Sequence, residues 1–201
     1  MPRYAHYAAR KTPNPALARR RGLDYVSAMS LKKIIIHPDP RLKKVCEQVD
    51  GISPELRKLA TDMLETMYDA PGIGLAAPQV GVLERFFVMD VAGKESAPEP
   101  RVLINPRISW VSDEVNVHEE GCLSIPGIYE DVTRPAKVRM QFKDIDGNDQ
   151  EEEFDDIAAT CVQHELDHLD GKLFVDYLSG IKRRMITAKM KKLKKERARE
   201  G

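Results

Sequence analysis

Residues 155–171 read Asp-Asp-Ile-Ala-Ala-Thr-Cys-Val-Gln-His-Glu-Leu-Asp-His-Leu-Asp-Gly and predict a helix, which an aspartate can begin and the glycine can end. His164 and His168 are four residues apart, so both imidazoles would lie on one face of this helix and could bind the same metal ion. Glu165 could then reach a water on that ion and act as a general base. The pentapeptide therefore indicates metal-assisted hydrolysis, and it leaves the third ligand open.

The third ligand decides the class of hydrolase. One large group of zinc proteases extends the motif as H-E-x-x-H-x-x-G-x-x-H, but Phe174 stands where the last histidine would be needed. The only glutamates downstream of the motif are Glu196 and Glu200, which lie in a basic tail. Upstream, Cys122 lies in the turn-rich segment Glu-Gly-Cys-Leu-Ser. As a thiolate it would be a soft ligand, and a Cys-His-His set leaves a fourth position open for water.

A loop of small residues, Gly-Ile-Gly-Leu-Ala-Ala-Pro-Gln, occupies positions 72–79. It lacks the third glycine and the Lys-Ser/Thr pair of nucleotide-binding loops, which excludes a phosphate-binding function. Small side chains would let an extended substrate backbone approach and pair with the loop. Gln79 offers an amide N–H for a developing oxyanion, although taken alone such a glutamine is more often structural.

Short apolar runs separated by turn signals predict strands over most of the remaining chain. Asp146-Gly147-Asn148 is typical of a hairpin turn. A helix is predicted to follow Ser53, which can cap it, and to end before Pro71-Gly72. Many short strands around one central helix favour an α+β fold over alternating βαβ units. The strands are expected at 86–91, 102–105, 108–111, 115–118, 138–142 and 151–154.

Length and composition are those of an ordinary globular domain. The 201 residues are 42% hydrophobic and 32% charged, and they suffice for one hydrophobic core. No apolar run approaches the roughly 18–20 residues that cross a bilayer, so we expect no membrane span and no secretory signal. Three cysteines without regular spacing, at 46, 122 and 161, favour a reducing compartment over a disulfide framework.

The charge is distributed unevenly, although the formal net charge is zero. Residues 1–30 contain six Lys or Arg and one acidic residue, residues 181–201 contain ten and two, and the body between them contains sixteen and twenty-nine. An acidic body with basic ends is not a general nucleic-acid binder, but the tail could reach a polyanion. The tail is predicted to be a helix that starts near 178–181, with Ile181, Met185, Met190 and Leu193 as its apolar positions.

Residues 1–30 show no apolar periodicity and are predicted to be a flexible N-terminal extension. Their content of arginine and scarcity of acids are also typical of an organelle transit peptide. Met29 leaves open that the natural chain starts just before the first predicted core residues.

These segments together resemble the peptide deformylase family. The family pattern is G-x-G-x-A-A-x-Q, then E-G-C-x-S, then Q-H-E-x-D-H, and this chain matches it at 72–79, 120–124 and 163–168. The resemblance implies an α+β deformylase fold in which antiparallel β-sheets surround the central HExxH helix and a C-terminal helix follows. The catalytic domain would cover 31–180, and the basic helix would cover 181–201.

The resemblance also implies an activity, namely removal of the formyl group from N-formylmethionyl nascent polypeptides with release of formate. The cofactor would be one divalent metal ion, natively Fe²⁺, with Zn²⁺, Ni²⁺ or Co²⁺ able to occupy the same site. We expect a monomer in the bacterial cytoplasm whose C-terminal helix could bind the ribosome. An HExxH metallopeptidase and an inactive ribosome-binding homologue are the alternative functions.

Roles carry over from the family residue by residue. The metal ligands would be Cys122, His164 and His168. Glu165 would transfer protons, and Gln79 with the backbone N–H of Leu123 would stabilise the tetrahedral oxyanion. Substrate backbone would contact Ile73 and Gly74, and the methionine pocket is expected to be lined by Ile73, Ile157, Thr160 and Cys161.

The remaining polar residues near these motifs are expected to be structural. Glu120 would pair with a basic residue such as Arg134, and Asp167 would orient a partner. His118 is interpreted as structural because strand alternation leaves its direction open. Tyr129 stands where some relatives carry an arginine at the rim of the pocket.

Overall fold

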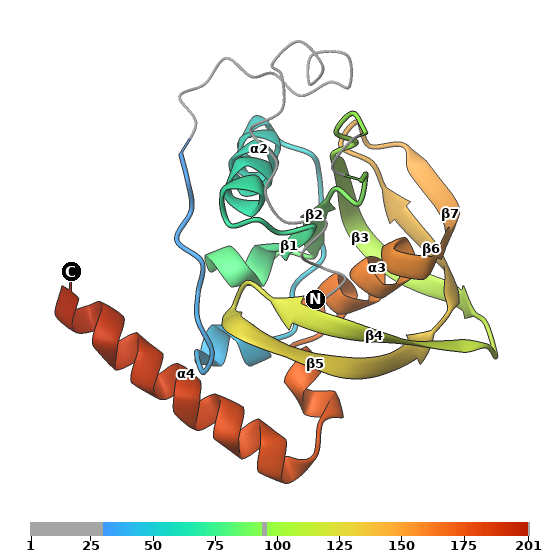
Figure 1. Ribbon diagram of the computed structural model, residues 1–201. Helices are drawn as coiled ribbons and strands as arrows, with labels where there is room; N and C mark the ends of the chain where they lie inside the picture. The colour runs from blue at the N-terminus through green and yellow to red at the C-terminus, as the bar shows by residue number, and fades with distance from the viewer. Residues whose placement is uncertain (1–29, 94–95, 201) are drawn as a thin grey trace.

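The structure, a computed structural model, describes residues 30–93 and 96–200 (Figure 1). The predictions made for residues 1–29 therefore lie outside the described residues. The helices are α2 (Pro54–Asp69), α3 (Asp156–Leu169) and α4 (Gly180–Glu200), with short 3₁₀ turns η3 (Pro40–Lys43), η4 (Ala77–Val80) and η5 (Phe174–Tyr177). The strands are β1 (Gly74–Ala76), β2 (Phe86–Met89), β3 (Arg101–Val111), β4 (Val115–Cys122), β5 (Ile125–Pro135), β6 (Lys137–Lys143) and β7 (Asp149–Asp155).

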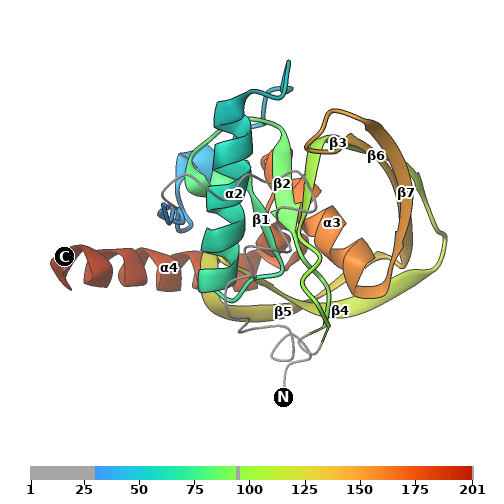
Figure 2. The ribbon, with the colours of Figure 1, turned by 90° about the horizontal axis from the view of Figure 1, so that it is seen from above.

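Two antiparallel sheets surround the motif-bearing helix, as the α+β prediction requires. Five strands form one sheet in the order β1-β2-β3-β6-β7, and β4 pairs with β5 in a two-stranded hairpin. The helix α3 lies between the two, with the five-stranded sheet on one side and the hairpin on the other (Figures 1 and 2). This position places the His-Glu-Leu-Asp-His turn next to the end of β4, which carries Cys122.

Strand β2 is buried on both faces and separates two halves of the core. Phe86 and Val88 pack with α2, whereas Phe87 and Met89 point to the other face and pack with α3. Successive side chains of a strand point to opposite faces, so a strand covered on both sides has an unbroken apolar sequence. This explains why Phe-Phe-Val-Met shows no polar alternation.

The predicted helix ends are confirmed. The hydroxyl of Ser53 accepts a hydrogen bond from the Leu56 N–H at 3.2 Å, and Pro54 occupies the first helical position of α2. Gly171, directly after the end of α3, has a positive φ of 70°, the left-handed conformation that favours glycine at this position.

The strand predictions needed three corrections. The two strands expected at 102–105 and 108–111 form one strand, β3, with a register shift between Ile104 and Arg107. Asn105 absorbs this irregularity, because its φ is 51° and its side chain holds both the N–H and the C=O of Val49. The short strand β1 lies within the loop of small residues, and β5 was not predicted, since Pro126 and Gly127 near its start are turn signals.

Helix α4 packs through a stripe that agrees only in part with the predicted one. Ile181 and Met185 are 65% and 68% exposed, so their assignment to the apolar face was wrong. The other two predicted positions are confirmed, because Met190 is 1% exposed and Leu193 packs partly buried beside it. Ile186, at 6% exposed, was missed, and it joins them in a cluster with residues of η3, β5 and η5. None of the described helices is long and apolar enough to cross a membrane.

Candidate active site

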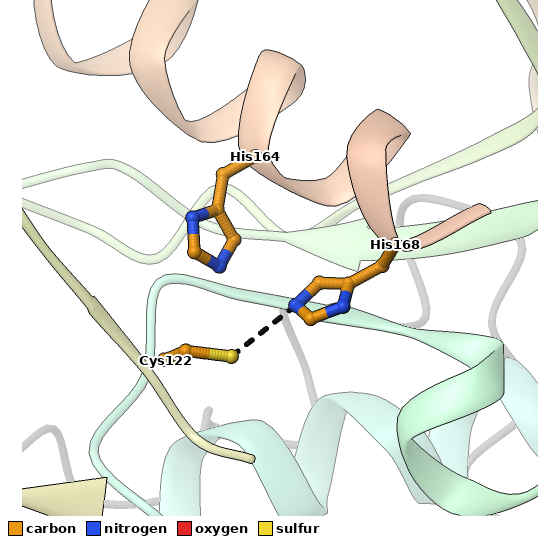
Figure 3. A group of neighbouring side chains, drawn as sticks. All are labelled: Cys122, His164 and His168. Carbon is orange, nitrogen blue, oxygen red and sulfur yellow. Dashed lines mark hydrogen bonds between the residues drawn. The ribbon is translucent and has the colours of Figure 1, made fainter. Parts of the chain in front are cut away.

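Cys122 meets two histidines that lie 42 and 46 residues further along the chain, His164 and His168 (Figure 3). Cys122 comes from the end of β4, and His164 and His168 come from adjacent turns of α3. One ligand atom from each lies within 4.8 Å of the other two, and Cys122 Sγ is 3.2 Å from His168 Nε2. A thiolate and two imidazoles at this separation fit around one ion with bonds of about 2.0–2.3 Å.

Glu120 fixes the direction of the first histidine. Its Oε2 lies 2.8 Å from His164 Nδ1, which leaves His164 Nε2 for the site. Histidines that bind metals almost always donate their second ring N–H to such a partner, which supports the fit of this residue set to a metal. Phe174 stacks on the same ring at a centroid distance of 6.1 Å, so the residue at the place of a third histidine supports His164 instead of binding.

A buried ion-pair network continues outward from Glu120. The guanidinium of Arg134 donates to both carboxylate oxygens of Glu120, at 2.5 and 3.0 Å, and to Asp167 Oδ2 at 2.8 Å. The hydroxyl of Tyr177 donates to the same Asp167 oxygen at 2.9 Å. The structure contains the predicted pairing of Glu120 with Arg134, and Asp167 holds the other side of the same guanidinium. Tyr177 was not singled out from the sequence.

The ion-pair network keeps the carboxylate of Glu120 ionised. Burial alone would raise the pKa of Glu120, but hydrogen bonds from His164 and Arg134 outweigh it and lower that pKa to about 2. Burial lowers the pKa of His168 well below its usual value. An ionised Glu120 behind one ligand and a neutral second imidazole are the states that metal binding needs.

Glu165 points into the site with one oxygen unsatisfied. It is 4% exposed, and its Oε2 has no hydrogen-bond partner among the described residues. Burial raises its pKa to about 7. A carboxylate whose pKa lies near neutral pH can both accept and return a proton, which is what a proton shuttle requires. A Cβ on Gly74 would lie 2.3 Å from Glu165 Oε1, so β1 approaches this carboxylate through a residue without a side chain.

Gln79 presents its amide nitrogen to the site. Its Oε1 accepts the Ala76 N–H at 2.8 Å, and its Nε2 lies 3.2 Å from Ser124 Oγ and 3.5 Å from Cys122 Sγ. Gln79 is 1% exposed, so this donor lies in a desolvated position beside the metal ligands. Ser124, its partner, was not singled out from the sequence.

A cavity of about 450 Å³ opens onto this cluster. All the predicted site residues except His168 line it: Ile73, Gly74, Gln79, Cys122, Leu123, His164 and Glu165. Thr160 and Cys161 line it as expected for the pocket, and Tyr129 lies at its edge with 51% of its surface exposed, whereas Ile157 does not line it. His118 instead bonds Thr160 Oγ1 through Nδ1 at 3.0 Å, in agreement with a structural role.

Sequence reasoning missed part of this lining. Ile34 and Ile36 come from the segment before η3, Ile128 comes from β5, and Arg197 comes from the last turns of α4. Only the stripe spacing of α4, which places Arg197 seven residues after the buried Met190, could have indicated the last of these.

An HExxH helix enclosed by antiparallel strands, with a cysteine completing the ligand set, defines a class of metal-dependent hydrolases. The family model described as polypeptide deformylase matches residues 31–184. This chain belongs to that family.

Two curated relatives illustrate the likeness in sequence. The chain is 54% identical over 169 residues to a peptide deformylase of Rhodopseudomonas palustris (strain BisB5), covering 83% of this chain and 97% of the relative. It is 53% identical over 171 residues to a peptide deformylase of Bradyrhizobium diazoefficiens, covering 83% of this chain and 98% of the relative.

Solved structures extend the likeness to the fold. A peptide deformylase from Legionella pneumophila matches with a TM-score of 0.78 at 44% identity, over 85% of this chain and 99% of that chain. A peptide deformylase from Ehrlichia chaffeensis in complex with actinonin matches with a TM-score of 0.77 at 41% identity, over 82% of this chain and 98% of that chain.

Proposed function

We propose that this protein is a metal-dependent hydrolase that removes the formyl group from N-formylmethionyl nascent polypeptides and releases formate. The observation that carries the proposal is the cluster of Cys122, His164 and His168 with Glu165 beside it, at one wall of a cavity bounded by β1. The metallopeptidase alternative is not favoured, because Phe174 is 1% exposed and packs on His164 in place of a third histidine. The inactive alternative is not favoured either, because Glu165, Gln79 and Cys122 are all present.

The substrate backbone would add to the free edge of β1. This strand lies at the end of the five-stranded sheet and pairs only with β2 among the described strands. An extended peptide could therefore pair with backbone groups of Ile73 and Gly74 on this edge, as in strand addition. The methionine side chain would then lie among Ile73, Thr160 and Cys161.

The chain's own residues supply the proton transfers and the oxyanion donors. Glu165 would take a proton from the water that attacks the formyl carbon and deliver it to the departing amine nitrogen. The Gln79 amide and the backbone N–H of Leu123 would hold the oxygen that becomes negative. A divalent ion bound by Cys122 and the two histidines would act as a Lewis acid and lower the pKa of water. We propose Fe²⁺ as the native ion, with Zn²⁺, Ni²⁺ or Co²⁺ as substitutes, and the reducing cytoplasm as the compartment.

The test is formate release from a formyl-Met peptide by anaerobically purified, metal-loaded protein, compared with Glu165→Ala. We expect the variant to lose about 10²–10⁴-fold in kcat while its metal content stays unchanged. Equal activity of the two proteins would contradict the proton-transfer role proposed for Glu165. Absence of formate release by the metal-loaded wild type would contradict the function itself.

We also propose that α4 binds ribosomal RNA. Its exposed cations include Lys189, Lys191, Lys192 and Lys195, which lie outside the buried stripe and could contact phosphates. Removing residues 188–201 would also remove the buried Met190, so Lys191→Glu with Lys195→Glu is the cleaner variant. Co-sedimentation with ribosomes should fall for this double variant and with rising salt, and unchanged binding would refute the proposal.

A further inference from the structure

One cation reaches the cavity from the C-terminal helix. Arg197 is the only Lys or Arg among the described residues that line it. The rest of the lining away from the metal ligands is largely apolar or small, and includes Ile34, Ile36 and Ile128. The family model ends at residue 184, so this cation lies outside the matched region.

The packing of α4 fixes where Arg197 points. Ile186, Met190 and Leu193 form the stripe by which α4 packs on the body, and their spacing of four and three residues follows the helical period. Arg197 comes four residues after Leu193 and continues the same stripe. This helix position would normally hold a residue that faces the hydrophobic core. The last turns of α4 lie beyond the core, however, and Arg197 lines the cavity instead.

Two contacts hold α4 near the segment that precedes η3. His37 Nε2 lies 2.9 Å from Thr187 Oγ1, and Lys194 Nζ donates to the Pro38 carbonyl at 3.4 Å. Both join α4 to residues that directly follow the lining residues Ile34 and Ile36. Arg199 lies two residues further on and hence on a different face of the helix, so it does not line the cavity.

Arg197 has no ion-pair partner among the side chains that the structure describes. Its side chain is exposed, and Glu196, the acidic residue directly before it, lies 3.8 Å from Lys192. Glu120, which also lines the cavity, is already bound by Arg134 and His164. A carboxylate entering the cavity would therefore find its cationic partner at Arg197.

We propose that Arg197 is a specificity-determining residue that favours substrates with an acidic side chain downstream of the formylated methionine. The inference rests on the proposed function, because it takes the occupant of the cavity to be a formylated peptide. The peptide continues beyond the residue whose formyl group lies at Glu165, so its later side chains must pass the outer lining. An acidic one would pair with Arg197, and a basic one would be repelled.

The test uses amidated formyl-Met-Ala peptides in which a single Glu, Lys or Ala is moved from the third to the sixth position. For the wild type at low ionic strength, we expect kcat/KM for Glu to exceed that for Lys about two- to fivefold at one or more positions, the size of an exposed ion pair. The ratio should approach one in Arg197→Gln and invert in Arg197→Glu. The matched control, Arg199→Glu, should keep the wild-type ratio, since it changes the same net charge away from the cavity.

Two results would overturn the inference while leaving the proposed function intact. One is formate release from the Ala peptide with no difference between Glu and Lys at any position. The other is an equal effect of Arg197→Glu and Arg199→Glu, which would indicate only the overall charge of the helix. Absence of formate release from every peptide would overturn both the inference and the proposed function.

Discussion

Gln79 presents a donor to the site because its other amide atom is held by the backbone. The Ala76 N–H binds Oε1 at 2.8 Å, and this contact leaves Nε2 to face Cys122 and Ser124. A glutamate at this position would keep the shape of the side chain but place an oxygen where the N–H now points. The structure therefore allows the donor to be removed without opening a cavity.

Gln79→Glu should lower kcat on a formyl-Met peptide by about 10²–10³-fold with little change in KM, because the lost donor acts on the developing oxyanion. The control is Gln48→Glu, the same chemical change at an exposed position outside the cavity, which should leave kcat unchanged. Metal content is measured for both proteins. A variant that retains wild-type kcat with full metal occupancy would show that Gln79 is only structural.

Gly74 is required by the close approach of β1 to Glu165. Gly74→Ala would place a Cβ 2.3 Å from Oε1 and 2.8 Å from Cδ of Glu165, and the carboxylate would have to move. We expect kcat/KM to fall about 100-fold, the cost of displacing a reacting group by roughly 1 Å. Gly51→Ala is the matched control, because no atom lies within 4 Å of its added Cβ. Equal activity of the two variants would contradict the proposed contact.

At the level of single residues, the sequence was informative where the signal is local. The spacing of His164 and His168 is a property of one helix, and their side chains do converge. Ser124 and Tyr177 had no such local signal, because each meets its partner through the packing of separate elements. The helical spacing of α4 places Arg197 on the buried stripe, but only the packing of α4 on the body shows that this residue lines the cavity. Ile157 was expected to line the methionine pocket, but it does not line the cavity.

Secondary-structure elements were predictable where caps and turns mark their ends. Ser53 begins α2, and Gly147, with a φ of 91°, lies in the turn of the β6–β7 hairpin. The first half of α4 was misread, because the helix carries apolar residues on two sides there. Which side packs depends on the cluster around Leu42, Ile125 and Phe174, and these residues come from three other elements.

The end of α3 depends on Gly171. Its φ is 70°, and an added Cβ would lie 2.7 Å from the Lys43 carbonyl oxygen, a backbone atom that cannot easily yield. Gly171→Ala should therefore lower the free energy of unfolding by at least about 1–2 kcal/mol, the cost of the left-handed conformation alone. Urea unfolding of metal-loaded protein measures it. Gly180→Ala, whose Cβ would meet only the flexible end of Arg184 at 3.5 Å, should show no loss.

At the scale of the whole molecule, the Arg134 network joins four elements around the metal ligands. Arg134 comes from β5, Glu120 from β4 and Asp167 from α3, and the ring of Tyr177 from η5 lies 4.9 Å from the guanidinium. Arg134 is 5% exposed and Glu120 is 1% exposed, so neither charge can be solvated if the other is removed. Arg134 thus joins the β4–β5 hairpin to α3, and its partner Glu120 also orients His164.

Arg134→Met keeps most of the side-chain volume but leaves two buried carboxylates without their cation. We expect a loss of about 3–5 kcal/mol in the free energy of unfolding, the usual result of breaking a buried pair from one side. Arg139→Met removes the same group from an ion pair with Glu153 whose side chains are 47% and 44% exposed, and should cost no more than about 1 kcal/mol. Urea unfolding of both metal-loaded variants makes the comparison. Failure of Arg134→Met to fold would agree with the expectation, whereas equal losses would show that burial of this network adds nothing to stability.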